Sequence, residues 1–417
     1  MLSVVPEDLG AQLANASAST IALSGNNTAT VTGFGAISVN PAGLAMPGSG
    51  FSLALVPVQV RAGLGPVGLS DLADYEGVVV PVATKEAWMT AIEAAGGQVG
   101  SVGVDVSALA LTVGNFGFQF STMASANATI PAGVAEAVLF GNAGRDPGNA
   151  ADLDLTGLSG DGFAVSTAAL SYAFPFGSAL LGLTGKYIVG HALGLATAQS
   201  GSVSSDPLRV TFDAPVVGPC EDEAIAGCTE DYWNAGSGTG LDVGFMMELP
   251  SLTIGASIEN IVNTFEWDVS RMSYRPGSVL FEQGTSESTF DETSYASAPA
   301  TLRARVGAYT FKPTLRVGAA LEFPIDLTVS GDIHRRLSDD GIALTPKSHV
   351  GLGAEFRGLR ILHLRAGAAV ITGGTQYSGG ASLVLGPINI SAAAAVQNGD
   401  DIPETAFGQF TFPIGNR

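Results

Sequence analysis

The sequence ATLRARVGAYTFKPTLRVGAALEFPIDLTVSGDIHRRL, residues 300–337, places apolar residues at alternate positions. After Pro313, every second residue from Leu315 to Phe323 is apolar, and the residues between them include Arg316 and Glu322. A period of two is typical of a strand with one apolar and one polar face. Strands of about ten residues with this pattern are typical of proteins that cross a membrane as a β-barrel. The stretch is therefore predicted to hold three strands, at 300–311, 313–323 and 326–336.

The same alternation recurs along most of the chain, with Gly, Pro, Asn or Asp between the segments. Single-chain bacterial barrels usually have an even number of strands, so we expect about 14, with one candidate belonging to a loop or to an internal segment. The other candidate strands are 50–63, 98–112, 115–124, 161–174, 176–192, 238–248, 250–258, 348–357, 360–371, 377–386, 387–397 and 404–413.

Composition supports a membrane setting. Charged residues make up only 13% of the 417 residues, against roughly 25% in a soluble domain. No uncharged apolar run is long enough for a membrane-spanning helix. A closed barrel is the other structure that leaves no backbone group unpaired in lipid. We therefore expect an all-β, antiparallel transmembrane barrel in contact with outer-membrane lipid.

The formal net charge is −20, which argues against a nucleic-acid partner because such binding needs a basic surface. The two cysteines, Cys220 and Cys228, lie close together in an acidic stretch. This spacing indicates a loop disulfide in an oxidising compartment, and two unpaired thiols are the alternative.

Two stretches have helical character and interrupt the strand pattern. In TKEAWMTAIEAAGG, Thr84 is a candidate N-cap and Gly96 a stop signal. In IPAGVAEAVLFGN, Pro131 stands near the start. We expect both to be short insertions in connections, alongside long acidic loops at about 125–160, 200–237 and 262–299.

Charged residues on the polar faces of the later strands are candidates for the lumen. They can form a basic wall that attracts a carboxylate head group, or an internal network of ion pairs that makes the barrel rigid. We favour the network, because charges buried away from lipid are usually paired. The predicted lumen-facing residues are Arg303, Arg305, Arg316, Glu322, Asp332, His334, Arg336, Glu355, Arg357, His363 and Arg365.

No pattern in the sequence indicates catalysis, a metal or a cofactor. Asp332 and His334 share a face, but no nucleophile motif accompanies them. Acidic residues flank the cysteines at Glu221, Asp222, Glu223, Glu230 and Asp231. Calcium could use such oxygens, but their spacing is not that of an EF-hand, which favours a solvated loop. We expect no enzyme activity, no metal site and no cofactor.

The stretch STIALSGNNTATVTGFGAISVNPAGLA, residues 19–45, resembles the amino-terminal signature of FadL-like outer-membrane transport proteins and their TraF-like and PorV-like relatives. The matching core is Asn40, Pro41, Ala42, Gly43, Leu44 and Ala45. The resemblance implies a 14-stranded barrel with an amino-terminal plug in the bacterial outer membrane, and passage of hydrophobic compounds such as fatty acids.

We therefore expect residues 1–49 to form a plug inside a barrel made by residues 50–417. Irregular backbone at membrane depth is tolerated only where protein or water satisfies it. Asn40, Pro41, Gly43 and Leu44 are the candidate plug motif. Two functions remain open. The barrel passes hydrophobic small molecules, or it is a structural or adaptor barrel that binds a protein partner through its outer loops.

Overall fold

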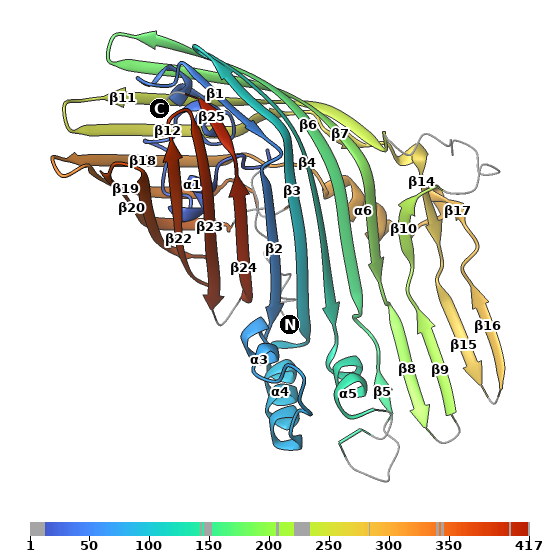
Figure 1. The fold of residues 1–417 in the computed structure, drawn as a ribbon. Coiled ribbons are helices and arrows are strands. Elements are labelled where there is room, and N and C mark those ends of the chain that lie inside the picture. The colour runs from blue at the N-terminus through green and yellow to red at the C-terminus, as the bar shows by residue number, and fades with distance from the viewer. Residues whose placement is uncertain are drawn as a thin grey trace.

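The computed structural model describes residues 13–141, 144–145, 152–205, 208–220, 234–282, 284–338, 342, 346–399 and 402–415. Long antiparallel strands curve around a central space that holds the helix α1, near the amino-terminus (Figure 1). The all-β barrel expected from the alternating segments is confirmed.

The wall is a closed barrel of 14 strands. The first strand is broken into β1 and β2, and the last into β24 and β25. The ring closes where β2 pairs with β24 and β1 pairs with β25. The wall strands are β1 (Phe51–Leu55), β2 (Val58–Gly65), β3 (Gln98–Val113), β4 (Phe116–Ile130), β6 (Ser159–Phe176), β7 (Ala179–Thr197), β11 (Gly236–Glu248), β12 (Leu252–Asn263), β18 (Thr314–Phe323), β19 (Leu327–Arg336), β20 (Ser348–Leu359), β21 (Leu362–Ile371), β22 (Gly374–Leu385), β23 (Ile388–Gly399), β24 (Ile402–Thr411) and β25 (Pro413–Gly415).

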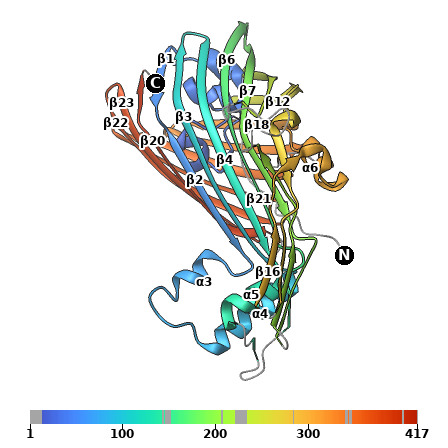
Figure 2. The same ribbon diagram turned by 90° about the vertical axis from the view of Figure 1, so that its right-hand side faces the viewer.

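The two ends of the barrel differ. At one end, which we call the short-turn end, tight turns join neighbouring strands, for example at Gly114 between β3 and β4 and at Gly177 between β6 and β7. At the opposite end, the long-connection end, the chain forms further helices and strands (Figures 1 and 2). These elements are α3 (Leu69–Ala73), α4 (Val82–Ala95), α5 (Ala132–Phe140), β5 (Leu153–Asp154), β8 (Ser200–Ser205), β9 (Leu208–Asp213), β10 (Val216–Pro219), β13 (Glu266–Trp267), η3 (Val269–Arg271), β14 (Met272–Arg275), β15 (Ser278–Glu282), β16 (Thr285–Thr289), β17 (Thr293–Ser294), η4 (Tyr295–Ser297) and α6 (Ala300–Ala308).

Five of these strands form a second sheet, in the order β16-β15-β9-β8-β5, which the sequence pattern did not reveal. It lies beyond the barrel wall in Figure 1. The two predicted helical insertions are present as α4 and α5. Thr84 is not the N-cap, because α4 already begins at Val82 after Pro81. Gly96 ends α4 in the left-handed conformation, with a φ of 80°.

The predicted strand at 300–311 is wrong, because these residues form helix α6. Leu302 and Val306 are buried on one face, and positions four apart satisfy a helical period as well as a period of two. Ala, Leu and Arg are strong helix formers, and Pro299 occupies the N-cap. The remaining 14 candidates match the 14 wall strands. The fifteenth candidate, 300–311, belongs to the connection between β12 and β18.

Side chains alternate between the outer and inner faces of the wall. Val317, Leu321, Leu352 and Leu364 are exposed on the outside, where a bilayer would contact them. Their sequence neighbours on the inside include buried polar groups such as Arg316. Within the described segments, no helix is both long enough and apolar enough to cross a membrane.

Cys220 is buried and follows β10, whereas Cys228 lies outside the described residues. The acidic residues at 221–223, 230 and 231 also lie outside them. The pairing of the cysteines therefore stays a prediction.

We expect mass spectrometry without reductant to find the two cysteine peptides linked. The closed loop is short, so its stabilisation should be about 2–3 kcal/mol at most. Two free thiols in exported protein would contradict the disulfide.

Ala319 tests the outward face. It is exposed in the middle of β18 and pairs with Ile254 and Gly331. Arg at this position should lower the free energy of unfolding by about 2–4 kcal/mol if it lies at the bilayer midplane, measured by refolding into lipid vesicles. Ala319→Ser is the matched control and should cost far less. Equal losses for the two variants would contradict the placement of this face in lipid.

Candidate functional site

The site is the amino-terminal segment, residues 13–49, and the inner wall that holds it. Its described elements are α1 (Ala18–Ala22), η1 (Gly33–Gly35), α2 (Ala36–Val39) and η2 (Pro41–Ala45). Polar side chains in it are buried as deeply as apolar ones, with Asn26, Thr28 and Asn40 all at 0% exposure. Deeply buried polar groups need hydrogen-bond partners. Those partners show where the segment is attached.

Asn40 in the predicted plug motif joins three pieces of backbone. Its side-chain oxygen accepts from the Ala42 N–H at 3.2 Å. Its amide donates to the Thr28 carbonyl at 2.9 Å, and to the Phe245 carbonyl of β11 at 3.1 Å. Pro41 begins η2 and Leu44 is buried. Asn40 therefore fixes the fold of the segment and attaches it to the wall.

Gly43 lies in the turn of η2, where its N–H donates to the Asn40 carbonyl at 2.9 Å, and it also meets a second stretch of backbone. A Cβ atom at Gly43 would lie 2.1 Å from the carbonyl oxygen of Val31. Its φ is not in the left-handed region. Glycine is therefore required by the close approach of two backbone stretches within the segment.

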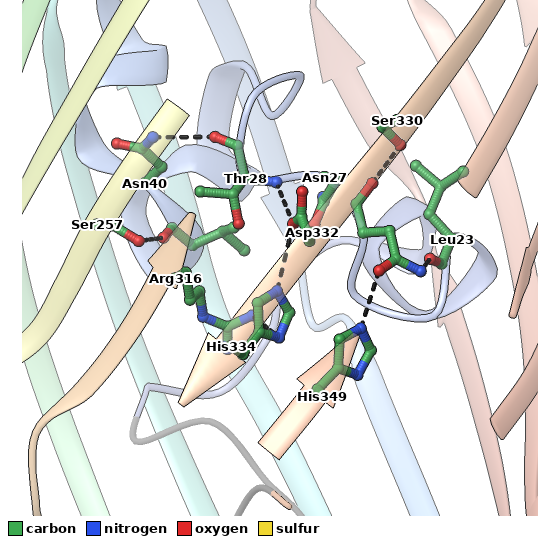
Figure 3. A network of polar contacts seen from close by, with 12 residues as sticks. Leu23, Asn27, Thr28, Asn40, Ser257, Arg316, Ser330, Asp332, His334 and His349 are labelled. Carbon is green, nitrogen blue, oxygen red and sulfur yellow. Dashed lines mark hydrogen bonds and ion pairs between the residues drawn. The ribbon is translucent and has the colours of Figure 1, made fainter. Parts of the chain in front are cut away.

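Strands β19 and β20 hold the segment through the contacts drawn in Figure 3. The Thr28 N–H donates to Asp332 Oδ2 at 2.9 Å. The Ser330 hydroxyl donates to the Asn26 carbonyl, and His349 Nε2 lies 2.8 Å from Asn26 Oδ1. We call these contacts the β19–β20 anchor. They bind both the backbone and the side chains of residues 26–28.

Other strands bind the segment in the same way around the ring. The Gln119 amide on β4 donates to the Ala14 carbonyl at 2.6 Å. The Ser257 hydroxyl on β12 donates to the Val39 carbonyl at 2.7 Å. On β22, the Ser24 and Ser378 hydroxyls are 2.7 Å apart. The segment is thus attached on several sides.

Glycines on the inner wall make room for the backbone of the segment. A Cβ atom added to any of them would lie within 2.1–3.2 Å of an atom of residues 22–42. Real Cβ atoms essentially never come within 3.0 Å of another atom, and the contacts of 3.1–3.2 Å at Gly353 and Gly318 are also unusually tight, so side chains at these positions would push the wall and the segment apart. The glycines are Gly117, Gly182, Gly244, Gly255, Gly318, Gly351, Gly353, Gly367 and Gly380. We call them the glycine belt.

Charged residues on the inner wall form ion pairs. Arg316 Nε forms an ion pair with Glu259 Oε1 at 2.6 Å, and His334 Nε2 lies within hydrogen-bond distance of Asp332 Oδ2, at 3.2 Å. The rings of His334 and His349 stack with centroids 4.3 Å apart. Figure 3 shows Arg316 and His334 beside the anchor. A network of paired charges therefore borders the segment.

A second group of charges lies on β20 and β21. Glu355 accepts from Arg357 at 2.5 Å, and Arg365 Nη2 is 2.5 Å from its other oxygen. His363 is buried on the same inner face, and Arg336 donates to the Ser338 carbonyl at 3.0 Å.

Three predicted lumen residues are placed differently. Arg303 and Arg305 are on α6, because that stretch is a helix and not a wall strand. Arg303 is exposed, and Arg305 donates to the Thr197 hydroxyl at 2.6 Å. Glu322 is exposed near the end of β18, at the mouth of the barrel.

Sequence reasoning missed two buried ion pairs. Lys186 on β7 is 2.6 Å from Asp242 on β11, and Arg61 on β2 is 2.9 Å from Asp105 on β3. Each residue alternates with outward apolar neighbours, for example Val60 beside Arg61 and Tyr187 beside Lys186. This alternation of charged and apolar residues is the feature of the sequence that could have revealed the two ion pairs.

A cavity of about 440 Å³ lies between the segment and strands β20–β25. Its lining includes Ser17 and Phe34 of the segment, and Arg357, Arg365 and Asn389 of the wall.

A family model described as a family of unknown function, DUF5723, matches residues 98–261. No curated protein matches the chain. The toluene transporter TbuX of Ralstonia pickettii is similar in structure, with a TM-score of 0.57, 15% identity and 99% of each chain covered. The toluene transporter TodX of Pseudomonas putida gives a TM-score of 0.50 and 12% identity, over 99% of this chain and 98% of that one.

A FadL homologue of Pseudomonas aeruginosa is also similar, at 10% identity and a TM-score of 0.49, over 97% of this chain and 99% of that one. The two toluene transporters carry the conclusion about the fold. The barrel architecture implied by the resemblance of residues 19–45 is confirmed.

The glycine belt leads to a test of how tightly the segment fits. A Cβ at Gly255 would lie 2.5 Å from the Thr28 carbonyl oxygen, so Gly255→Ala should push residues 28–29 away from β12. We expect a loss of about 1–3 kcal/mol, together with faster amide hydrogen exchange in the segment. Gly185→Ala is the control, because a Cβ there would have no neighbour closer than 4.0 Å. Similar exchange rates in both variants would refute the close fit.

Proposed function

We propose that this protein is a bacterial outer-membrane channel for hydrophobic small molecules and that the amino-terminal segment is its plug. The observation that carries this proposal is the similarity of fold to a toluene transporter over 99% of both chains. In outer-membrane barrels, short turns face the periplasm and long connections face outward. The short-turn end would then be periplasmic, and the exposed apolar outer face would contact the lipid.

An apolar layer near the long-connection end suits the entry of a hydrophobic molecule. Phe163 on β6 and Leu193 on β7 belong to one buried cluster with Leu302 of α6. Phe265 packs against Trp267 and Phe311, with ring centroids 5.2 and 5.5 Å apart. Aromatic and aliphatic linings are typical of sites for apolar ligands.

Helix α6 covers part of this layer and is linked to the wall by polar contacts near its carboxyl end. Tyr309, just after the helix, donates to Asp161 on β6 at 2.7 Å, and Arg305 donates to Thr197 at the end of β7. We infer that α6 is a movable cover over the apolar layer. Elements outside the hydrogen-bonded wall are the parts of a barrel that can move while the wall stays intact.

We infer that the protein is not an enzyme. The pair of Asp332 and His334 is already engaged by Thr28 and Arg316, so neither residue is available to activate a nucleophile or water. Among the described residues, no three His, Cys, Asp or Glu side chains are grouped to hold a metal. The buried charges serve to hold the plug.

An adaptor barrel without transport is the second candidate. It is favoured by the number of wall strands that bind the segment, because a plug attached on several sides is costly to release. Such a barrel would use its long connections to bind a protein partner. The two candidates differ in whether the segment ever leaves the wall.

A disulfide lock separates the two candidates. The Ser24 and Ser378 hydroxyl oxygens are 2.7 Å apart, a spacing at which cysteines in both positions can form a disulfide with little backbone movement. Bacteria that carry the native barrel should take up labelled toluene or fatty acid faster than bacteria without it. Oxidised Ser24→Cys/Ser378→Cys protein should reduce uptake to the background rate, and reductant should restore it.

The single variant Ser24→Cys and the native protein, treated with the same oxidant, control for effects on the natural cysteines. Uptake that the lock leaves unchanged would show that molecules pass with the plug in place. Absence of uptake by folded native barrel, for both apolar compounds, would overturn the channel proposal and support the adaptor.

A further inference from the structure

The cavity beside the plug differs in character from the apolar layer at the other end. It reaches the surface at the short-turn end, since its lining includes the exposed residues Gly48, Asp326 and Arg357. Its volume of about 440 Å³ is within the usual range for small-ligand sites. Most of its lining side chains are polar, and several are hydroxyls.

The two arginines in the lining are fixed by one carboxylate. Glu355 contacts both Arg357 and Arg365 at 2.5 Å. Arg365 also donates to the Ser382 hydroxyl at 2.6 Å. These three charged groups sum to +1. Asp326 at the rim and Glu322 near Arg357 carry opposing charges, but both are exposed to solvent and therefore screened.

Two buried polar atoms in the lining lack hydrogen-bond partners among the described residues. One is the Nε donor of Arg365 and the other is the Oδ1 acceptor of Asn389. The Arg365 side chain is only 10% exposed. Leaving a buried donor or acceptor unpaired costs free energy. Both atoms are almost fully covered, so a molecule in the cavity that supplied an acceptor and a donor would be favoured after a small turn of the two side chains.

We propose that this cavity binds a small hydroxylated anion, in which an oxyanion meets Arg357 and Arg365 and a hydroxyl group donates to Asn389. A phosphate ester and a hydroxy acid share this chemistry. Phe34 and Ile414 line the cavity as well and would contact the carbon skeleton. This ligand is distinct from the hydrophobic cargo, because it enters from the short-turn end and occupies a polar site.

The position of the cavity gives the site a regulatory consequence, which rests on the proposed function. One wall is the plug, through Ser17, Thr32 and Phe34, and the opposite wall is the barrel. A ligand that contacts both walls binds only when the plug is in place. Binding to one of two states shifts the equilibrium toward it. The anion should therefore hold the channel closed.

The test uses purified full-length barrel in a detergent that contains no phosphate. We expect calorimetry to detect binding of glycerol 3-phosphate or of glycerate, and not of neutral glycerol. The two anions separate the phosphate source from the carboxylate source. Arg357→Gln should weaken binding about tenfold or more, because it removes a charged hydrogen-bond donor.

Arg360→Gln is the matched control, because Arg360 is exposed at the same end of the barrel and does not line the cavity. It should leave the affinity nearly unchanged. No binding of either anion, or equal losses in the two variants, would overturn the site. Calorimetry measures binding without transport, so its result tests the anion site independently of the channel proposal.

Hydrogen exchange tests the regulatory part. Saturating anion should slow exchange of the amides in residues 13–49, and Arg357→Gln should remove that effect at the same concentration. Binding without a change in exchange would overturn the regulation while leaving the site intact.

Discussion

The structure depends on one constraint, which is that the backbone of the amino-terminal segment must find hydrogen-bond partners at membrane depth. Its short helices and turns leave carbonyl and amide groups that lipid cannot satisfy. The inner wall supplies the partners through Asp332 to Thr28, Ser257 to Val39 and Gln119 to Ala14. Because these contacts come from β19, β12 and β4, the closed ring and the folded segment require each other.

Close approach is what makes those contacts short enough. A wall with ordinary side chains at Gly244 or Gly255 would hold the segment away, since a Cβ atom would meet Asn40 or Thr28 at 2.1 and 2.5 Å. The polar side chains then contact backbone directly, without a bridging group. The ion pairs of Arg316 with Glu259 and of Lys186 with Asp242 complete the arrangement, because a charge inside the barrel is tolerated when it is paired.

The sequence predicted the wall well because a strand with lipid on one face must alternate at every step, as β18 does from Leu315 to Phe323. It failed at residues 300–308, where Leu302 and Val306 fit both periods and the helix-forming residues between them, after Pro299 at the N-cap, favour a helix. The Asn40–Pro41 core of the amino-terminal segment could be picked out from the sequence, and in the structure Asn40 binds Phe245 of β11. The glycine belt could not be picked out, because its members look like ordinary strand glycines until the segment that they face is known. The second sheet was equally hidden, since its strands are only two to six residues long.

The two ends of the lumen have opposite chemistry, and this bears on how a hydrophobic molecule could cross. Near the long-connection end it would contact Phe163, Phe265 and Trp267. Beyond the plug it would meet Arg357, Arg365 and a hydroxyl-rich lining. An apolar molecule that enters the polar half gains nothing from those groups and displaces the water or ions that solvate them. Under the channel proposal, favourable contacts with an apolar molecule end where the amino-terminal segment lies, so movement of that segment, and not the shape of the polar cavity, would set the rate of passage.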